Sequence, residues 1–149
     1  MLYGLIGEKL GHSYSCEIHE KIADYHYELR EIPREELADF FAKRDFKGIN
    51  VTIPYKEAVM PLLDEISDTA KAVGAVNTVV NRGGRLYGYN TDLAGMTAML
   101  RRAGIDPSGK KALVLGTGGT SKTARAVLKS LGAASITLVS RSGREGGVT

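Results

Sequence analysis

The sequence has few of the residues that build disulfide or metal sites. Cys16 is the one cysteine among 149 residues. A lone cysteine cannot form an internal disulfide, and without a patterned cluster of other ligands it does not make a metal site. We therefore expect neither a disulfide framework nor a bound metal. The simplest role for Cys16 is that of a small residue at the start of a helix.

Long hydrophobic runs and charge clusters are also missing. The 20 basic and 17 acidic residues are scattered, with a net charge of +3 and no basic run of the kind that binds nucleic acid. The apolar segments are shorter than a membrane span, and the N-terminus lacks the charged-then-apolar order of a signal peptide. We expect a soluble, cytoplasmic protein with no nucleic-acid or membrane partner. Its length suits one domain, or one domain and a fragment of another.

The first hundred residues alternate between strand and helix patterns. The first helix carries Ile18, Ile22 and Tyr25 on one apolar stripe. Two strand-like segments flank residues 81–85, whose paired glycines supply the positive φ angles of a hairpin. We expect strands at residues 2–6, 27–32, 49–53, 76–80 and 86–89, and helices over residues 15–25, from Pro33 and from Pro54. The hairpin adds one antiparallel pair to an otherwise parallel sheet.

The last sixty residues show one more helix and then a strand–helix–strand pattern. Asn90 or Thr91 can cap the helix, and Gly104 ends it. Residues 105–109 form a linker, and the apolar run 112–115 is typical of a strand covered on both faces. A turn, a helix to about residue 131 and a strand at 136–140 complete a βαβ unit. The polar, glycine-rich residues 142–149 are expected to be mobile.

Together these patterns predict an α/β fold in two parts. Residues 1–103 form a three-layer α/β/α domain with a mostly parallel sheet. Residues 104–149 form an incomplete Rossmann-type βαβ unit, because a complete doubly wound domain has about six strands and this segment supplies two.

A glycine-rich turn joins the strand and helix of the βαβ unit. Gly116, Thr117, Gly118, Gly119 and Thr120 follow the buried strand and open the helix. Glycines there let the backbone approach a pyrophosphate, and the N–H groups at the helix start attract its charge. The third glycine of the usual pattern is displaced, so the alternative is an ordinary tight turn. The strand, turn and helix spacing favours the nucleotide site.

The end of the next strand indicates which dinucleotide binds. An acidic residue there would hold a ribose 2′-hydroxyl, but this chain has Ser140 and Arg141, with Arg144 close behind. Arginine forks bind phosphate, so NADP(H) fits better than NAD(H). The alternative is a pair of surface arginines.

One strand leads directly to a lysine. Asn50 and Thr52 lie on the polar face of the strand at residues 49–53, and Pro54 then suits the first turn of a helix. Lys56 is thus expected near the positive end of a helix dipole, which disfavours its ammonium form and makes it a better proton acceptor. The alternative is a solvated lysine beside Glu57.

Other polar side chains stand at element ends, where α/β clefts collect ligands. Ser13 and Ser15 can hold a carboxylate, or simply cap a helix. Asn77 can hydrogen-bond to a substrate hydroxyl, or it can only stabilise a turn. Asp92 can pair with Lys56, or its negative charge can only interact favourably with the dipole of the helix that it starts.

The motifs HSYS, NVTIPYKE, GAVNT, NTD and GTGGTS, in this order, resemble the shikimate dehydrogenase family. The resemblance implies NADPH-dependent, reversible reduction of 3-dehydroshikimate to shikimate, on the route to chorismate and the aromatic amino acids. It implies a catalytic pair, Lys56 and Asp92, and further substrate ligands Ser13, Ser15, Thr52 and Asn77. It also implies that the glycine turn holds the cofactor phosphates and that Arg141 contacts the 2′-phosphate.

Under this resemblance, residues 1–103 are the shikimate-binding domain and residues 104–149 are the start of the NADP domain, so we expect a truncated form. The alternatives are a non-catalytic substrate-binding fragment and a quinate/shikimate dehydrogenase. We further expect the segment 111–149 either to pair with a second copy of the chain or to remain loosely ordered.

Overall fold

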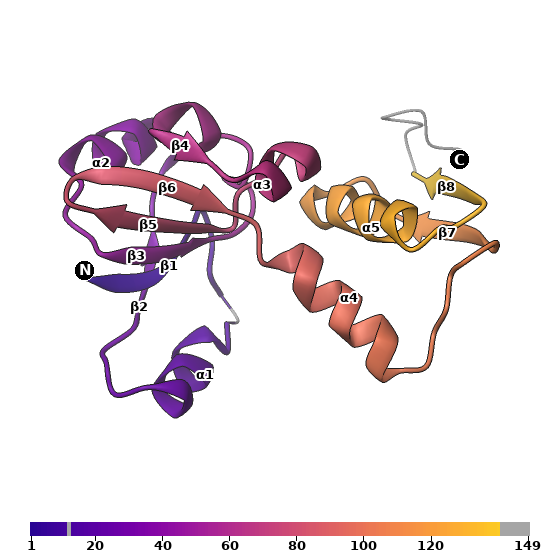
Figure 1. The fold of residues 1–149 in the computed structure, drawn as a ribbon. Coiled ribbons are helices and arrows are strands. Elements are labelled where there is room, and N and C mark those ends of the chain that lie inside the picture. The colour runs from indigo at the N-terminus through magenta and orange to yellow at the C-terminus, as the bar shows by residue number, and fades with distance from the viewer. Residues whose placement is uncertain (12, 141–149) are drawn as a thin grey trace. The chain divides into compact units, whose positions relative to one another are not determined.

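The computed structural model describes residues 1–11 and 13–140 of the chain (Figure 1). Over this part the chain divides into two compact units. The first consists of Met1–Lys71 and Ala75–Asn90, and the second of Ala72–Gly74 and the residues from Thr91 onward. Helix α4 therefore groups with the second unit, although the sequence places it before the predicted domain boundary at residue 103. The functional assignment of the two domains remains a prediction.

The first unit holds the larger sheet. Its elements are β1 (Tyr3–Gly7), α1 (Ser15–Ile22), β2 (Glu28–Glu31), the 3-10 helix η1 (Arg34–Glu36), α2 (Leu37–Lys43), β3 (Gly48–Val51), the 3-10 helix η2 (Met60–Leu62), β4 (Glu65–Ile66), β5 (Thr78–Arg82) and β6 (Arg85–Tyr89). Helix α3 (Asp68–Val73) crosses the boundary between the units.

The strand order of this sheet is β2-β1-β3-β5-β6-β4 (Figure 1). Strand β1 pairs in parallel with β2 and β3, and β4 pairs in parallel with β6. Strand β5 is antiparallel to both β3 and β6. The predicted hairpin is confirmed, because Gly83 and Gly84 have φ angles of 58° and 88° at its turn. The mostly parallel α/β fold is confirmed as well. The expectation that the hairpin is the one antiparallel pair is wrong, because β5 is also antiparallel to β3.

The core lies between the central strands and α2. Ile49 and Val51 of β3 are buried and pack in one cluster with Leu37 and Phe41 of α2. Because side chains alternate along a strand, Asn50 between them faces the other side of the sheet. The strand therefore has one apolar and one polar face, as the sequence predicts.

Helix α1 contributes little to this core. None of its residues 15–22, all of which the structure describes, is buried, and Ile18 and Ile22 are 53% and 71% exposed. The helix ends at Ile22 because Ala23 is in an extended conformation. The predicted extension to Tyr25 is thus wrong. Tyr25 instead contacts the ring of His19 edge-on, and His19 stacks on Tyr27 with ring centroids 3.9 Å apart.

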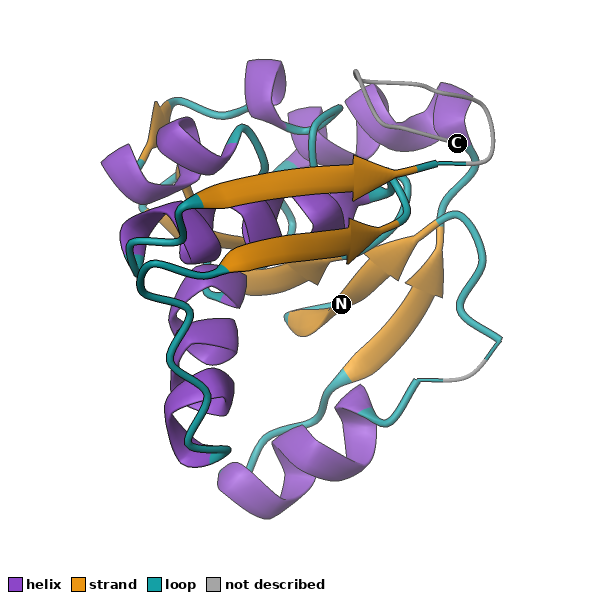
Figure 2. Cartoon of the chain, turned by 90° about the vertical axis from the view of Figure 1, so that its right-hand side faces the viewer, coloured by secondary structure: helices purple, strands orange, loops and turns teal. Residues whose placement is uncertain are grey.

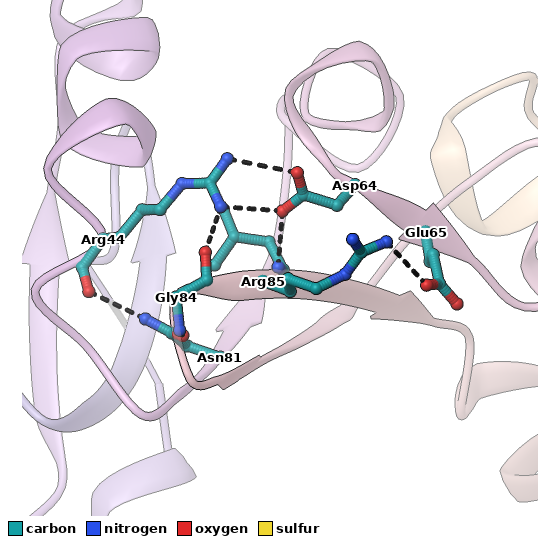
Figure 3. A network of polar contacts seen from close by, with 7 residues as sticks. Arg44, Asp64, Glu65, Asn81, Gly84 and Arg85 are labelled. Atoms are coloured by element: carbon teal, nitrogen blue, oxygen red, sulfur yellow. Dashed lines mark hydrogen bonds and ion pairs between the residues drawn. The ribbon is translucent and has the colours of Figure 1, made fainter.

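A polar cluster fixes the hairpin to neighbouring loops (Figure 3). The Arg44 guanidinium donates to both Asp64 carboxylate oxygens, at 2.8 and 3.3 Å, and to the carbonyl of Gly84. Asp64 Oδ2 also accepts the backbone N–H of Leu86 at 2.7 Å. The Asn81 side chain bonds the Arg44 carbonyl and the Gly84 N–H. Charge-assisted bonds from two segments hold the Asp64 pKa below its usual range, the Leu86 N–H being the larger cause and Arg44 the next.

The second unit contains α4 (Asp92–Arg102), β7 (Lys111–Leu115), α5 (Gly119–Ser130) and β8 (Ser135–Val139). Gly104 follows α4 with a φ of 66°, as expected for a glycine that ends a helix. Strands β7 and β8 are parallel, with Lys111 opposite Ser135 and Leu115 opposite Val139 (Figure 2). The predicted βαβ connection is therefore present.

One face of this two-stranded sheet is uncovered in the described part of the chain. Val127 of α5 and Leu138 of β8 are buried, whereas Leu113 and Leu115 of β7 are 70% and 80% exposed. The apolar run 112–115, which is typical of a strand covered on both faces, is covered on one face by the described residues, because α5 packs against only the alternate side chains. The described residues include no helix long and apolar enough to cross a membrane.

Candidate active site

The candidate site in the first unit forms where β3 ends and β5 begins. The backbone N–H of Val51 donates to the carbonyl of Asn77 at 2.8 Å, and the N–H of Val76 donates to the carbonyl of Lys56 at 2.8 Å. Two segments that carry predicted substrate ligands are thus joined through their backbones. The structure therefore brings together the backbones that bear Lys56 and Asn77.

Lys56 does not lie in the first turn of an α-helix, so that prediction is wrong. The chain after β3 forms turns, with Tyr55 N–H bonded to the Thr52 carbonyl and Met60 N–H bonded to the Glu57 carbonyl. An α-helix would instead direct the Met60 N–H to the carbonyl of Lys56, which accepts from Val76. The helix-dipole argument for Lys56 as a proton acceptor is lost with the helix.

Within these turns, the ring of Tyr55 is buried. Its hydroxyl donates to the carbonyl of Ile32 at 2.6 Å, and the side chain is part of the core cluster. Burial raises the pKa of the Tyr55 phenol, so it remains a donor.

Thr52 lies immediately after β3, close to β1. Its N–H donates to the Ile6 carbonyl at 2.9 Å. A Cβ at Gly7 would lie 2.8 Å from the Thr52 methyl group, so the absence of a side chain at Gly7 permits this close approach. Thr52 is consequently held against β1 at the carboxyl end of the parallel strands.

Asn77 is buried and its amide is hydrogen-bonded. The Thr78 hydroxyl donates to Asn77 Oδ1 at 3.1 Å, and Asn50 Nδ2 donates to the Thr78 oxygen at 3.1 Å. The Tyr27 hydroxyl in turn donates to Asn50 Oδ1 at 2.7 Å. Tyr27 was not identified from the sequence, because its partner Asn50 lies on another strand, and Thr78 was noted there only as a member of the GAVNT motif.

Ser13 and Ser15 form a small polar pair before α1. The Ser13 hydroxyl lies 3.0 Å from the Ser15 hydroxyl and accepts the Ser15 N–H at 3.2 Å. Ser13 thus bonds two residues ahead, as in a serine turn, while Tyr14 occupies the N-cap position. The two hydroxyls are adjacent, which suits joint binding of one carboxylate.

Asp92 is the first residue of α4 and belongs to the second unit. Two residues earlier, the buried side chain of Asn90 donates to the Ala75 carbonyl at 2.9 Å and fixes the end of β6. The pairing of Asp92 with Lys56 remains a prediction.

The glycine turn has a form that suits a dinucleotide phosphate. Gly116 follows β7 with a φ of 101°, a conformation that favours glycine. Ser121 closes the turn, with its N–H and its hydroxyl both bonded to the Gly118 carbonyl at 2.8 and 2.7 Å. A Cβ at Gly116, Gly118 or Gly119 would meet none of the described atoms within 4 Å, so the backbone is approachable. The turn thus fits the group predicted for it.

The predicted 2′-phosphate contacts are only partly described. Ser140 follows β8 and is buried, whereas Arg141 and Arg144 lie outside the described residues. Within the ranges 1–11 and 13–140, no group of three or more histidine, cysteine and acidic residues is placed to hold a metal ion.

A model of the shikimate dehydrogenase substrate binding domain matches residues 5–79. This match contains Ser13, Ser15, Thr52, Lys56 and Asn77. The chain belongs to this family. Asp92 and the glycine turn lie beyond the matched residues.

Individual relatives match over most of the chain. A shikimate dehydrogenase (NADP(+)) of Clostridium perfringens is 46% identical over 148 residues, covering 94% of this chain and 55% of that protein. The crystal structure of shikimate dehydrogenase 1 from Peptoclostridium difficile has a TM-score of 0.92 at 39% identity, covering 99% of this chain and 57% of the other. Shikimate 5-dehydrogenase from Thermus thermophilus, solved with NADP(H) and shikimate, has a TM-score of 0.83 at 33% identity, covering 95% of this chain and 57% of the other. The chain thus spans about half the length of these relatives.

Proposed function

We propose that this chain serves the NADPH-dependent, reversible reduction of 3-dehydroshikimate to shikimate, with substrate bound by the first unit. The observation that carries the proposal is the backbone pairing of Lys56 with Val76 and of Val51 with Asn77 inside the matched family region. This pairing supports a site at one edge of the sheet, where α/β folds bind ligands, to which Lys56 contributes its ammonium group and Asn77 its amide. The names of the relatives are consistent with this chemistry.

The substrate ligands have separate roles. The adjacent hydroxyls of Ser13 and Ser15 bind the ring carboxylate. Thr52 and Asn77 bind ring hydroxyls. The ammonium group of Lys56 faces the ketone oxygen, where it stabilises the developing negative charge and holds the proton that the oxygen receives. Asp92 holds that ammonium group in position.

NADP is the proposed cofactor, and when bound it supplies the hydride. Gly116, whose N–H donates to the Val139 carbonyl, gives the diphosphate room to approach the turn, and Thr117, Gly118, Gly119 and Thr120 present backbone N–H groups to it near the start of α5. Ser140, Arg141 and Arg144 bind the 2′-phosphate. An arginine guanidinium forms two charge-assisted hydrogen bonds with a phosphate, whereas the ribose 2′-hydroxyl of NAD carries no charge to pair with it. The site therefore prefers NADP to NAD.

A second candidate is a substrate-binding form that is not catalytic alone and associates through its second unit. One observation favours it: Leu113 and Leu115 are exposed on β7. Under this candidate the chain binds shikimate weakly and oxidises little or none of it with NADP.

Calorimetric titration of the chain with shikimate, beside an NADP-dependent oxidation assay, tests both candidates. The variant carrying Ser13→Ala and Ser15→Ala should lose most of its binding, whereas Ser130→Ala, on α5, should not. Binding with turnover supports the enzyme, and binding without turnover supports the second candidate. A chain that does not bind shikimate contradicts both.

A further inference from the structure

Helix α1 carries one of the proposed carboxylate ligands but is not part of the hydrophobic core. None of its residues 15–22, all of which lie in the described ranges, is buried, and it stands apart from α2, the helix that packs on the sheet (Figure 1). Ser15 is its first residue, and the Ser15 N–H donates to the Ser13 hydroxyl at 3.2 Å. Both hydroxyls therefore move with the helix, and their position depends on what fixes α1.

His19 joins the helix to the sheet through two aromatic side chains. Its ring stacks on Tyr27, with centroids 3.9 Å apart and planes 11° from parallel, and its Nδ1 hydrogen-bonds to the Tyr25 hydroxyl. Tyr27 is buried, and its hydroxyl bonds to Asn50 Oδ1 of β3 at 2.7 Å. The Tyr25 ring centroid lies 4.9 Å from that of Tyr3 in β1. His19 is thus fastened to side chains that two strands of the sheet hold in place.

One face of α1 bears both the attachment and the proposed ligand. Ser15, Cys16 and His19 are half-buried, whereas the other five residues of the helix are exposed. Residues three and four positions apart lie on the same face of a helix, and Cys16 Sγ also donates to the Tyr27 carbonyl at 3.3 Å. Four residues span about 6 Å along a helix. His19 therefore fixes α1 about one turn from the Ser15 hydroxyl.

We propose that His19 is a positioning residue, which holds α1 in the orientation that presents the Ser13 and Ser15 hydroxyls to the substrate carboxylate. Without its ring the helix would populate several orientations, and only the fraction with both hydroxyls in place would bind the carboxylate well. This inference rests on the proposed function, in which the two serines bind the ring carboxylate, and it adds the residue that sets where they lie. His19 acts on affinity more than on the chemical step.

His19→Ala tests the proposal by removing the ring and both of its contacts. Shikimate binding should weaken roughly tenfold, which corresponds to about nine in ten molecules leaving the productive orientation. His19→Phe keeps a ring that can stack on Tyr27 and should recover most of the affinity. His26→Ala is the matched control, because the His26 side chain is 79% exposed, and it should bind shikimate as the parent chain does. In a chain extended to the length of the relatives, His19→Ala should raise KM and change kcat little.

The combination of His19→Ala with Ser15→Ala gives a sharper criterion. Both substitutions act on the same contact with the carboxylate, so the loss of affinity in the double variant should be smaller than the product of the two single losses. A loss equal to that product would show that His19 acts independently of Ser15, and it would overturn the proposal. Parent-like affinity of His19→Ala, or a His19→Phe variant as weak as His19→Ala, would overturn it as well.

A measurement without substrate separates this proposal from the function on which it rests. Residual dipolar couplings, measured by NMR in the unliganded chain, report the orientation of the α1 N–H bonds relative to those of the sheet. Both a new orientation and added motion change these couplings, so they should differ in His19→Ala and match the parent in His26→Ala. Unchanged α1 couplings in His19→Ala would overturn the positioning role whether or not shikimate binds. If the parent chain does not bind shikimate while the couplings change as expected, only the proposed function is overturned.

Discussion

Lys56 is the residue from which the proposed chemistry is most directly testable. In a chain extended to the length of the relatives, Lys56→Ala should lower kcat by about a hundredfold or more, the usual contribution of a positioned proton donor. Its affinity for shikimate should change far less, because the proposed interaction strengthens in the transition state. Steady-state kinetics and calorimetric binding measure the two effects separately.

Lys47→Ala is the control for this experiment, since Lys47 is exposed and lies before β3. Its kinetics should match those of the parent enzyme. Unchanged turnover in Lys56→Ala would remove Lys56 from the mechanism.

Tyr55 is expected to act on stability rather than chemistry. Tyr55→Phe leaves the buried Ile32 carbonyl without the hydroxyl that it accepts, so the free energy of unfolding should fall by about 1 kcal/mol. Urea denaturation followed by circular dichroism measures this loss. Tyr14 is exposed, so the control Tyr14→Phe should unfold at the same urea concentration as the parent chain. If Tyr55→Phe also unfolds at that concentration, the Tyr55 hydroxyl contributes nothing to the free energy of unfolding.

At the scale of elements, the cluster around Asp64 joins the hairpin to the loop after α2 (Figure 3). Folding lowers the pKa of Asp64. At pH values above the Asp64 pKa in the unfolded chain, the ionised carboxylate therefore stabilises the fold. This stabilisation is lost as the pH falls through the Asp64 pKa of the folded chain. The loss should begin near the unfolded value of about 4 and continue below it.

Asp64→Asn should therefore lower the melting temperature at about pH 7, and the difference from the parent chain should shrink below about pH 4. Thermal melts at several pH values measure this convergence. Asp68→Asn is a suitable control, because Asp68 has an exposed carboxylate that only approaches Lys71 at 3.9 Å. A constant Asp64→Asn difference at all pH values would contradict the assigned cause.

Elements with local signals could be predicted from the sequence. The Gly83–Gly84 turn and the helix end at Gly104 depend on neighbouring residues, and both are confirmed. The helix expected at Lys56 fails because the Lys56 carbonyl bonds to Val76, twenty positions away. Strand β4 was not predicted, because it has only two residues and is recognised mainly by its pairing with β6, which the sequence does not show.

In the candidate site, too, residues with a local sequence signal could be predicted, and residues defined by contacts between distant segments could not. Ser13, Ser15, Thr52, Lys56 and Asn77 could be named from family motifs. Tyr27 has no motif, and its relation to Asn50 arises only when the segment before β2 packs beside β3. Contacts between distant segments therefore separate what the sequence predicts from what the structure adds.

At the scale of the whole molecule, the uncovered face of β7 has a consequence in solution. Leu113 and Leu115 expose apolar area that association would remove from water. The chain should therefore form dimers or larger species whose share rises with concentration, as measured by light scattering. Leu113→Lys with Leu115→Lys should shift the mass toward that of a monomer, and Ile18→Lys on α1 controls for added charge. A monomeric parent chain at all concentrations would contradict self-association.

The bonds from Val76 to Lys56 and from Val51 to Asn77 also bear on the thermodynamics of ligand capture. They fix the main chain beside two proposed ligands before any substrate arrives, so little backbone freedom remains to be lost on binding. The first unit thus resembles a rigid receptor, in which shikimate would give up its own freedom of movement while the protein gives up very little.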